Sequence, residues 1–512
     1  MTEDLHIVIG SGPAGVSAAK ALLTRGRSVM MVDGGKRLEP AAAARQADLA
    51  ATNPGGWSEQ TRDDWMAPQY ATPPGQVRRY GSDFAMEPGA STFADAPGWM
   101  ALRASRAAGG LSNLWGAAVL PYGEKDMAGW PVTTEDLAPH YHAVAEFLSV
   151  AGIPDTLEPL FPSLPMAGRG AIEPAPQAKE LLRRLDGKRA ALAAMGVHGG
   201  QARQAVDASC RRCGLCLHGC PYRLIWSAAD TLADLLWHPG FTYRSGAVVK
   251  RITEAEGVTL HLEDGTEITG TRAYLGAGVL ETARILLASD PSLVELTLKD
   301  SQHAFLPMLH RWANATRPDR GPFHTLPQAF VEIDAPEVSP FLVHAQIYTW
   351  NEYFPRDLVQ NYARKLPLSA PFFTALARRL IVAQMFLHSD HSHRIALKLA
   401  PDGRLLPRLE TNPTVEGTLK QAVRHMGKAM SRLGLLPLTF AARPGAPGSS
   451  FHAGASVPMA EAAGKGQSDI LGRPAGWQRL HLIDASCLPA IPATTITFSV
   501  MANAHRIGSL AP

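Results

Sequence analysis

Short apolar runs and a glycine-rich turn alternate at the start of the chain. An apolar run covers residues 6–9, the glycine-rich turn covers 10–15, and a stretch of helical composition follows over 16–24. A second apolar run, 28–32, ends in Asp33. This order predicts a strand, a tight turn, a helix and a second strand.

The glycines of the turn have the spacing of a nucleotide site. In the segment GSGPAG, Gly10 would permit the turn, Gly12 would let backbone N–H groups approach a pyrophosphate, and Gly15 would let the helix pack close to the strand. The carboxylate of Asp33 could accept hydrogen bonds from a ribose diol. The segment therefore predicts an adenine dinucleotide site, and both FAD and NAD fit its geometry.

The composition is that of a globular protein with a large core. Of the 512 residues, 46% are hydrophobic and 19% are charged, and the net charge is +3 without a basic run. This charge pattern argues against nucleic-acid binding, which requires the neutralisation of many phosphates. No segment has the roughly 18 to 20 apolar residues of a transmembrane helix, and no secretory signal is visible, so we expect a cytoplasmic protein.

A second glycine-rich segment favours a flavin over a nicotinamide. Residues 103–116 are RASRAAGGLSNLWG, with small side chains that would allow close approach to a flat ring. This segment resembles the GGxSxxWG motif of the glucose-methanol-choline oxidoreductases, in particular their pyranose oxidase and sugar dehydrogenase branch. Three further stretches, 130–141, 276–289 and 481–486, resemble the same family in the expected order.

The resemblance implies an α/β fold with two domains. A Rossmann-like FAD-binding domain would be discontinuous, with one part in residues 1–290, including a cysteine-rich loop over 207–226, and the other in 446–512. Residues 291–445 would form a substrate-binding domain of antiparallel sheet plus helices. Within this middle part, which matches the family least, the apolar stretch 372–387 predicts a helix packed on the protein's own core.

The resemblance also implies how FAD is bound. Pyranose oxidases attach their flavin to a histidine of the second glycine-rich segment, but Leu114 occupies that position here, so we expect non-covalent FAD. The implied contacts are Gly10, Gly12 and Gly15 at the pyrophosphate, Asp33 at the adenosine ribose, Val249 at the adenine, Asp484 at the ribityl or pyrophosphate group, and Gly110, Ser112 and Asn113 near the isoalloxazine ring.

Oxidation of an alcohol by FAD requires a base for the hydroxyl proton, and imidazole is the usual one. On its own, a histidine among small residues is more often a structural hydrogen-bonding group. The segment SSFHAGAS around His452 resembles the family's xHxxGTxxM motif, which implies that His452 is the base. The family's second His or Asn is replaced by Thr495, which cannot act as a base near neutral pH. Thr495 would orient the substrate or contact the flavin, or its presence indicates different chemistry, such as desaturation.

Four cysteines follow the spacing CxxCxxCxxxCP of bacterial ferredoxins: Cys210, Cys213, Cys216 and Cys220. Three of these thiolates would hold a [3Fe-4S] cluster, as in some flavin sugar dehydrogenases that the chain resembles. A [4Fe-4S] cluster would need Cys220 or the remote Cys487 as its fourth ligand. A structural zinc ion, or thiols without any metal, also fit four closely spaced cysteines.

These patterns together predict an FAD-dependent dehydrogenase that oxidises a CH–OH group of a sugar or other alcohol to a carbonyl. The electrons would pass to an external acceptor, a protein or a quinone, rather than directly to oxygen. Two alternatives stay open, namely a flavin-dependent desaturase or isomerase and a non-catalytic electron-transfer flavoprotein subunit.

Overall fold

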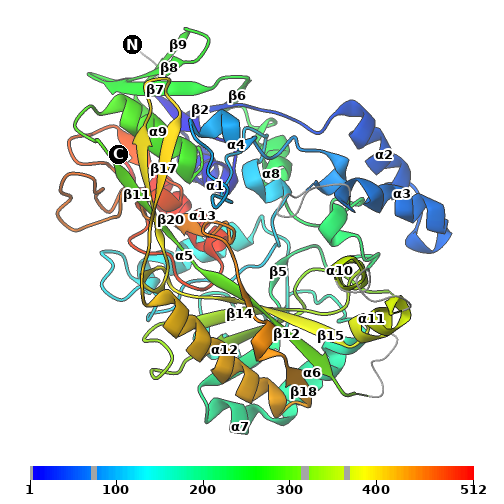
Figure 1. Cartoon of the computed structure of the whole chain (residues 1–512). Helices are drawn as coiled ribbons and strands as arrows, with labels where there is room; N and C mark the ends of the chain where they lie inside the picture. The colour runs from blue at the N-terminus through cyan, green and yellow to red at the C-terminus, as the bar shows by residue number, and fades with distance from the viewer. Residues whose placement is uncertain (1–3, 71–77, 313–321, 362–368) are drawn as a thin grey trace.

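The computed structural model describes residues 4–70, 78–312, 322–361 and 369–512. The upper half of the molecule in Figure 1 is built on a parallel sheet, and the lower half on an antiparallel sheet backed by helices. The predicted α/β fold with a second, antiparallel part is therefore confirmed. Within the described ranges, no helix is both long enough and apolar enough to cross a bilayer.

Five parallel strands form the upper sheet, in the order β21-β10-β1-β2-β6. Strand β1 lies in the middle and is almost fully buried, as expected for a continuous apolar run in a parallel sheet. Helix α1 connects it to β2, which confirms the predicted order of strand, turn, helix and strand. The bounds are β1 Leu5–Ile9, α1 Pro13–Thr24, β2 Ser28–Asp33, β6 Phe241–Ser245, β10 Arg272–Leu275 and β21 Leu480–Leu482.

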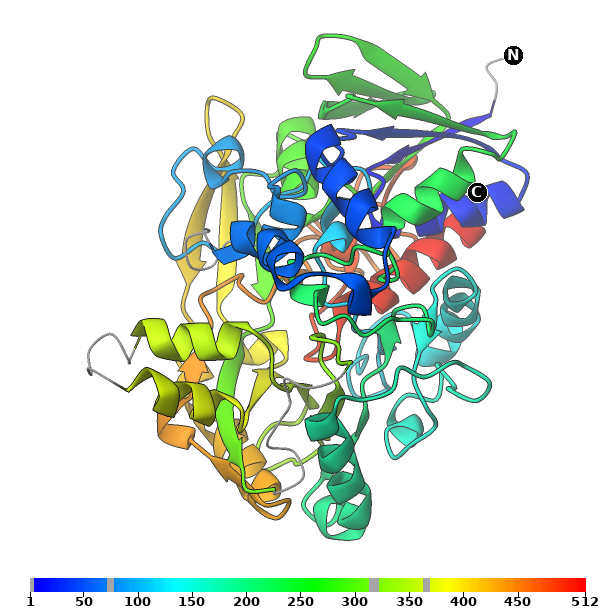
Figure 2. The same ribbon diagram turned by 90° about the vertical axis from the view of Figure 1, so that its right-hand side faces the viewer.

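Helices from the two ends of the chain pack against each other in this upper half (Figures 1 and 2). The C-terminal helix α13, Ile496–Leu510, lies on α1. A Cβ at Gly508 would lie 2.9 Å from the carbonyl oxygen of Ala18, so a glycine is needed for this close crossing. The C-terminal helix is thus packed against the unit formed by β1, α1 and β2, whereas its assignment to a discontinuous FAD-binding domain stays a prediction.

The lower sheet is antiparallel and has seven strands. Six follow the order β18-β12-β15-β14-β13-β4, and β19 also pairs with β12. Strand β4 comes from residues 1–290, so a division at residue 290 does not coincide with the limits of this sheet, and the domain limits stay a prediction. The bounds are β4 Val197–Gln201, β12 His303–His310, β13 Ala329–Ile333, β14 Val343–Tyr348, β15 Leu380–Phe386, β18 Leu435–Pro437 and β19 Arg443–Pro444.

The two faces of the lower sheet contact different partners. Side chains such as Val331 pack against the helices α6, Pro176–Gly187, and α12, Val415–Ser431, which cover the outer face. Since successive side chains of a strand point to opposite faces, Phe330 and Glu332 lie on the inner face. Phe330 packs there with Ala118 and Leu120, which come from the N-terminal part of the chain. The inner face is thus turned toward the upper half of the molecule.

The helix predicted over residues 372–387 is wrong. The structure has a short helix, α11, over Ala370–Ala377 and then the strand β15 over Leu380–Phe386. Strand β15 pairs with β12 on one side and with β14 on the other. A continuous apolar run suits a strand that is central in a sheet, and periodicity alone does not distinguish it from a buried helix.

Further elements connect or cover these sheets. A four-stranded sheet, β17-β16-β11-β20, links the two halves, and a three-stranded meander, β7-β8-β9, lies at the top of Figure 1. The remaining bounds are α2 Pro40–Ala50, α3 Glu59–Tyr70, α4 Gly89–Thr92, α5 Thr134–Ala145, β3 Val150–Ala151, α7 Arg189–Ala193, β5 Gln204–Ala205, α8 Ala228–Leu235, β7 Val249–Glu254, β8 Val258–Leu262, β9 Glu267–Gly270, α9 Val279–Ser289, β11 Leu296–Asp300, α10 Tyr353–Asn361, β16 Arg394–Leu399, β17 Leu405–Glu410 and β20 Ala453–Gly454.

Candidate functional site

The glycine turn after β1 is closed on its protein side and open on the other. Gly10 has φ +94°, and a Cβ there would lie 2.5 Å from the carbonyl oxygen of Gly276. A Cβ at Gly15 would lie 1.9 Å from the carbonyl oxygen of Gly10. At Gly12, in contrast, a Cβ would meet no protein atom within 4 Å. The first and third glycines are therefore required by the fold, whereas the second keeps a surface clear.

That clear surface belongs to a cleft with about 1260 Å³ of empty space, part of it open to solvent. The cleft lies at the carboxyl ends of the parallel strands, where β1 has β2 on one side and β10 on the other, which is the usual ligand position in such sheets. Its lining residues lie in the ranges 9–14, 32–34, 102–107, 110–111, 247–249, 276–281, 484–485 and 496–497, together with Ile285, Phe451, Ala453 and Val500. Segments from both ends of the chain therefore meet around one elongated cleft.

Asp33 lies at the end of β2 and lines this cleft. Its carboxylate accepts hydrogen bonds from the hydroxyls of Ser11 and Tyr243, the latter over 3.2 Å. Burial raises the pKa of Asp33 to about 6, and these hydrogen bonds only partly oppose the rise. The position fits the predicted contact with a ribose diol, because a buried carboxylate gains from further hydrogen-bond donors.

Asp484 joins the C-terminal strand to the N-terminus of α9. Its Oδ2 accepts hydrogen bonds from the backbone N–H of Gly278, at 3.0 Å, and from the hydroxyl of Thr282, at 2.6 Å. Burial raises the pKa of this carboxyl above its ordinary value. Asp484 and the predicted adenine contact Val249 both line the cleft.

The second glycine-rich segment reaches the cleft through its glycines. Gly110 lines the cleft, and a Cβ on it would lie 3.4 Å from Cα of Gly12. Ser112 and Asn113 are not among the lining residues. Ser112 accepts a hydrogen bond from the N–H of Ala228, and the Asn113 amide donates to the carbonyl of Gly110 over 2.7 Å. In this structure these two residues shape the turn, and a contact with a flavin ring stays a prediction.

His452 does not itself line the cleft, although its two neighbours Phe451 and Ala453 do. Its ring stacks on Phe386 of β15, with ring centroids 4.9 Å apart. The Nδ1 atom is buried and has no hydrogen-bond partner among the described residues. Burial lowers the pKa of His452 to about 3, with further contributions from His344 and His303. The ring is therefore neutral at physiological pH and keeps one lone pair available.

Thr495 immediately precedes helix α13 and is buried. Its hydroxyl oxygen accepts a hydrogen bond from the backbone N–H of Leu120, at 3.0 Å. The hydroxyl hydrogen is left for donation to another group. Thr495 itself does not line the cleft, but its neighbours Ile496 and Thr497 do.

The four cysteines of the CxxCxxCxxxCP segment line one small second cavity. The backbone N–H of Leu224 donates to the sulfur of Cys220 over 3.4 Å. Burial raises the pKa of Cys210 to about 12, and the neighbouring Cys216 adds to this rise. In the part of the chain that the structure describes, no three His, Cys, Asp or Glu side chains converge closely enough for a single metal ion. A metal at this cavity thus stays a prediction.

Cys487 lies elsewhere and does not line the cysteine cavity. Its thiol donates to the carbonyl oxygen of Asp484, at 3.2 Å, and accepts from the side-chain amide of Asn503, at 3.4 Å. The suggestion that Cys487 supplies a fourth cluster ligand is therefore wrong. The reason is its position behind the C-terminal strand, where its thiol is already paired.

Two buried acids near the site were missed from the sequence. Glu332 is fully buried on the inner face of the lower sheet and pairs with His344 over 2.7 Å. Asp126 is also buried, with a hydroxyl of Thr494 at 3.4 Å from its Oδ2. An acidic residue inside an apolar strand such as AFVEI was the available signal for Glu332. Nothing comparable in the sequence singles out Asp126.

Comparisons with known proteins show what the chain is similar to. Residues 6–115 match the family model described as "FAD binding domain". The chain is 29% identical to 6'''-hydroxyparomomycin C oxidase of Streptomyces lividus over 268 residues, which cover 48% of this chain and 41% of that protein. It is also similar to the crystal structure of pyridoxine 4-oxidase from Mesorbium loti, with a TM-score of 0.58, 14% identity, and coverage of 99% of this chain and 98% of that one.

The family match begins at β1 and ends just after the second glycine-rich segment, so it spans the turn and part of the cleft. The structural similarity extends over both halves of the molecule. Residues 6–115 therefore match an FAD-binding domain, and the chain as a whole has a fold like that of pyridoxine 4-oxidase.

Proposed function

We propose that this protein oxidises a CH–OH group of a sugar or other alcohol to a carbonyl, with His452 as the base. The observation that carries the proposal is the position of His452, between two residues of the flavin cleft and with an unpaired, buried Nδ1. Bound FAD would accept the hydride from the alcohol carbon. The 6'''-hydroxyparomomycin C oxidase, to which the chain is similar, supports a hydroxylated substrate by its name.

The chain's own residues would hold the cofactor in a defined direction. The turn that contains Gly12 would take the pyrophosphate at the N-terminus of α1, and Asp33 the adenosine ribose. Val249 would contact the adenine, and Asp484 would lie near the ribityl or pyrophosphate group. Because Leu114 cannot form a covalent link, FAD would be held by these non-covalent contacts alone.

His452 and Thr495 would have different roles at the substrate hydroxyl. The neutral imidazole of His452 accepts the hydroxyl proton as the hydride leaves the carbon, so that the alcohol loses one hydride and one proton. The hydroxyl of Thr495 already accepts a hydrogen bond from Leu120, so its hydrogen can be donated to the substrate oxygen. Thr495 would then orient the substrate without acting as a base.

Anaerobic reduction of the flavin by a panel of alcohols and sugars tests this function. We expect bleaching of the flavin absorbance together with carbonyl formation, slowed about 100- to 10,000-fold in His452→Ala. His142→Ala, at an exposed histidine of α5, is the matched control and should behave as wild type. Bleaching with formation of an alkene would instead indicate a desaturase, and no bleaching with any compound would indicate an electron-transfer subunit.

The cysteine cavity supports a second, more specific proposal, that it holds an iron–sulfur cluster which passes electrons to an external protein or quinone. A cluster of several irons accepts thiolates that are farther apart than the ligands of one ion, and the N–H of Leu224, which donates to Cys220, suits it. Anaerobic purification followed by iron, zinc and sulfide analysis separates a cluster from zinc and from free thiols. Cys213→Ser should lose iron and retain FAD; equal metal content in both proteins would contradict the proposal.

The electron acceptor needs its own measurement, because both similar proteins are named oxidases. Reoxidation of the reduced flavin can be followed with oxygen alone and with a soluble quinone. We expect reoxidation by the quinone to be faster than reoxidation by oxygen if a cluster in the cysteine cavity carries electrons to an external acceptor. Equal or faster reoxidation by oxygen would contradict the external acceptor.

A further inference from the structure

The loop that carries His452 has a strained backbone. Phe451 has φ +58° and Ala455 has φ +55°, so two residues other than glycine adopt the left-handed conformation that favours glycine. Such a conformation persists only where surrounding contacts hold it, and it is common at functional sites. Phe451 directly precedes His452 and lines the flavin cleft. The contacts that hold this loop therefore determine where the imidazole lies relative to the cleft.

Asp300, the last residue of β11, holds the loop through its carboxylate. Its Oδ2 accepts a hydrogen bond from the backbone N–H of Gly448 at 2.7 Å, and its Oδ1 accepts one from the hydroxyl of Ser450 at 3.1 Å. The oxygen of Ser450 in turn accepts a hydrogen bond from the backbone N–H of His452 at 3.0 Å. Asp300 is fully buried, at 1% exposed. One buried carboxylate is thus connected to the loop at Gly448 and, through Ser450, to His452.

The residue that follows Asp300 connects the loop to the strand on which the imidazole stacks. The backbone N–H of Ser301 donates to the carbonyl of His452 at 3.0 Å, and its hydroxyl donates to the carbonyl of Leu387 at 2.8 Å. Leu387 directly follows Phe386, the partner of the His452 ring. Asp300 and Ser301 therefore hold both sides of this ring contact.

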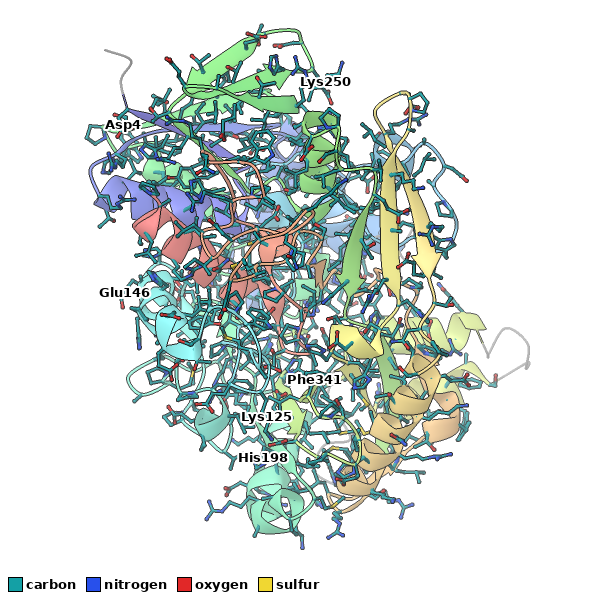
Figure 3. All side chains as sticks on the ribbon, turned by 90° about the vertical axis from the view of Figure 1, so that its left-hand side faces the viewer. Asp4, Lys125, Glu146, His198, Lys250 and Phe341 are labelled. Carbon is teal, nitrogen blue, oxygen red and sulfur yellow. The ribbon has the colours of Figure 1, made fainter. Side chains whose placement is uncertain are left out.

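The carboxylate lies on a strand that is paired on both sides. Strand β11 has β16 on one side and β20 on the other, and Asp300 lies opposite Ala453 of β20, the residue after His452. Figure 3 shows the yellow hairpin β16–β17 of this sheet extending from the middle of the molecule into its upper half. Residues 445–452, in contrast, form turns and irregular backbone. The sheet thus supplies the fixed end of the contact.

We propose that Asp300 is a positioning residue for the oxidation: it fixes the loop over 445–452 so that His452 stacks on Phe386 while Phe451 lines the flavin cleft. This inference rests on the proposed alcohol oxidation at His452. A displacement of about 1 Å in a reacting group costs about 100-fold in rate, so a fixed loop matters for the chemical step.

Asp300 acts through the loop and not on the substrate or on the charge of the imidazole. It does not line the cleft. The charged groups that affect the pKa of His452 are His344 and His303, and Asp300 is not among them. Both carboxylate oxygens are used by hydrogen bonds to the loop.

Three variants test this contact. Asp300→Ala removes both acceptors, and Ser450→Ala removes only the connection to His452. Asp300→Asn keeps the size of the side chain, and its amide can accept from the N–H of Gly448 and donate to the oxygen of Ser450. Asp234→Asn, at an exposed residue of α8, is the matched control and should behave as wild type.

Reduction of the flavin by the fastest alcohol of the panel gives kcat and KM for each FAD-loaded variant. We expect Asp300→Ala to lower kcat about 100-fold with little change in KM, because the base is displaced while the substrate still binds. Ser450→Ala should lower kcat by a smaller factor, and Asp300→Asn should restore most of the lost rate. Wild-type kcat in Ser450→Ala, and in Asp300→Ala where it folds, would overturn the inference.

A spectroscopic measurement follows the ring without turnover. In FAD-loaded protein with 13C-labelled histidine, the Cε1–H signal of His452 is assigned by its loss in His452→Gln. Because the imidazole stacks on Phe386, this signal should carry a ring-current shift, which Asp300→Ala and Ser450→Ala should reduce and Asp300→Asn should retain. These shifts without flavin reduction by any alcohol would uphold the positioning and refute the oxidation. An unchanged signal in Asp300→Ala and Ser450→Ala would overturn the positioning itself.

Discussion

Replacement of Gly12 by alanine separates the fold of the nucleotide turn from its binding role. Gly12 has φ −66°, which alanine adopts readily, and its added Cβ would contact no protein atom within 4 Å. The folded apoprotein should therefore be as stable as wild type, or more stable by about 0.4–1 kcal/mol, because alanine restricts the unfolded chain. The methyl group would instead occupy space at the edge of the cleft.

The expected loss of FAD affinity follows from the donors at this helix N-terminus. Pro13 has no N–H, and the N–H of Val16 is already bonded to the carbonyl of Gly12. The N–H groups of Ala14 and Gly15 are left for a phosphate. If the methyl group displaces the phosphate from one of them, the loss of a charge-assisted hydrogen bond costs about 1.5–3 kcal/mol. This corresponds to about a 10- to 150-fold increase in the Kd for FAD.

Flavin-free protein titrated with FAD, with fluorescence quenching as the signal, gives the Kd, and urea unfolding of the apoprotein gives the stability. Gly98→Ala is the control, since Gly98 is exposed and its added Cβ also meets nothing within 4 Å. Gly15→Ala should destabilise the apoprotein itself, because its Cβ would lie 1.9 Å from a backbone oxygen. Wild-type FAD affinity in Gly12→Ala would refute the placement of the pyrophosphate at this turn.

Three further predictions concern protonation. Burial lowers the pKa of His452 to about 3, so protonation of this ring should not reduce kcat/KM between pH 8 and about 5. A profile of kcat/KM against pH checks this. A loss of activity near pH 6.5 in the wild type that is absent in His452→Gln would contradict it. The pKa of Asp33 is raised from 3.8 to about 6, so the carboxyl loses its proton first in the unfolded state, and the stability of the apoprotein should fall as the pH rises between these values. Asp33→Asn should remove this part of the pH dependence, which urea unfolding would measure as about 1–3 kcal/mol. An unchanged stability profile in the variant would disprove the argument. The pKa of Cys210 is raised to about 12, so its thiolate fraction at pH 8 should be about 1000-fold smaller than that of free cysteine. Metal-free protein should therefore react with iodoacetamide far more slowly than free cysteine, with the extent of labelling measured by mass spectrometry. Rapid labelling would show that the thiol is not held protonated.

The sequence predicted the nucleotide turn correctly because its chemistry is local. The roles of Gly10 and Gly15 depend on a few neighbouring residues, and an acidic residue at the end of the next strand is brought near by the single crossover helix α1. Asp484 could be named only through the resemblance to a family, since its approach to Gly278 joins segments that lie 206 positions apart.

Predictions from the sequence failed where a local pattern fits two kinds of secondary structure, or where the contacts of a residue come from distant parts of the chain. The apolar run after residue 378 fits a buried helix and a central strand equally, and its pairing with β12 and β14 decided for the strand. Cys487 was considered a ligand for its residue type, but its thiol is directed at Asp484 and Asn503. The flavin contact of Ser112 stays a prediction, because its hydroxyl oxygen accepts a hydrogen bond from the N–H of Ala228 and Ser112 does not line the cleft.

The sequence by itself determined the turn and the first strands, because glycine conformations and short-range spacing follow from adjacent residues, whereas the choice of FAD over NAD needed the resemblance to a family. Only the tertiary structure decided that Glu332, His344 and Phe386 form one row beneath His452, since that row depends on the register of strands that come from separate parts of the chain. Register is fixed by burial of one whole face of the sheet, a property that no single strand carries.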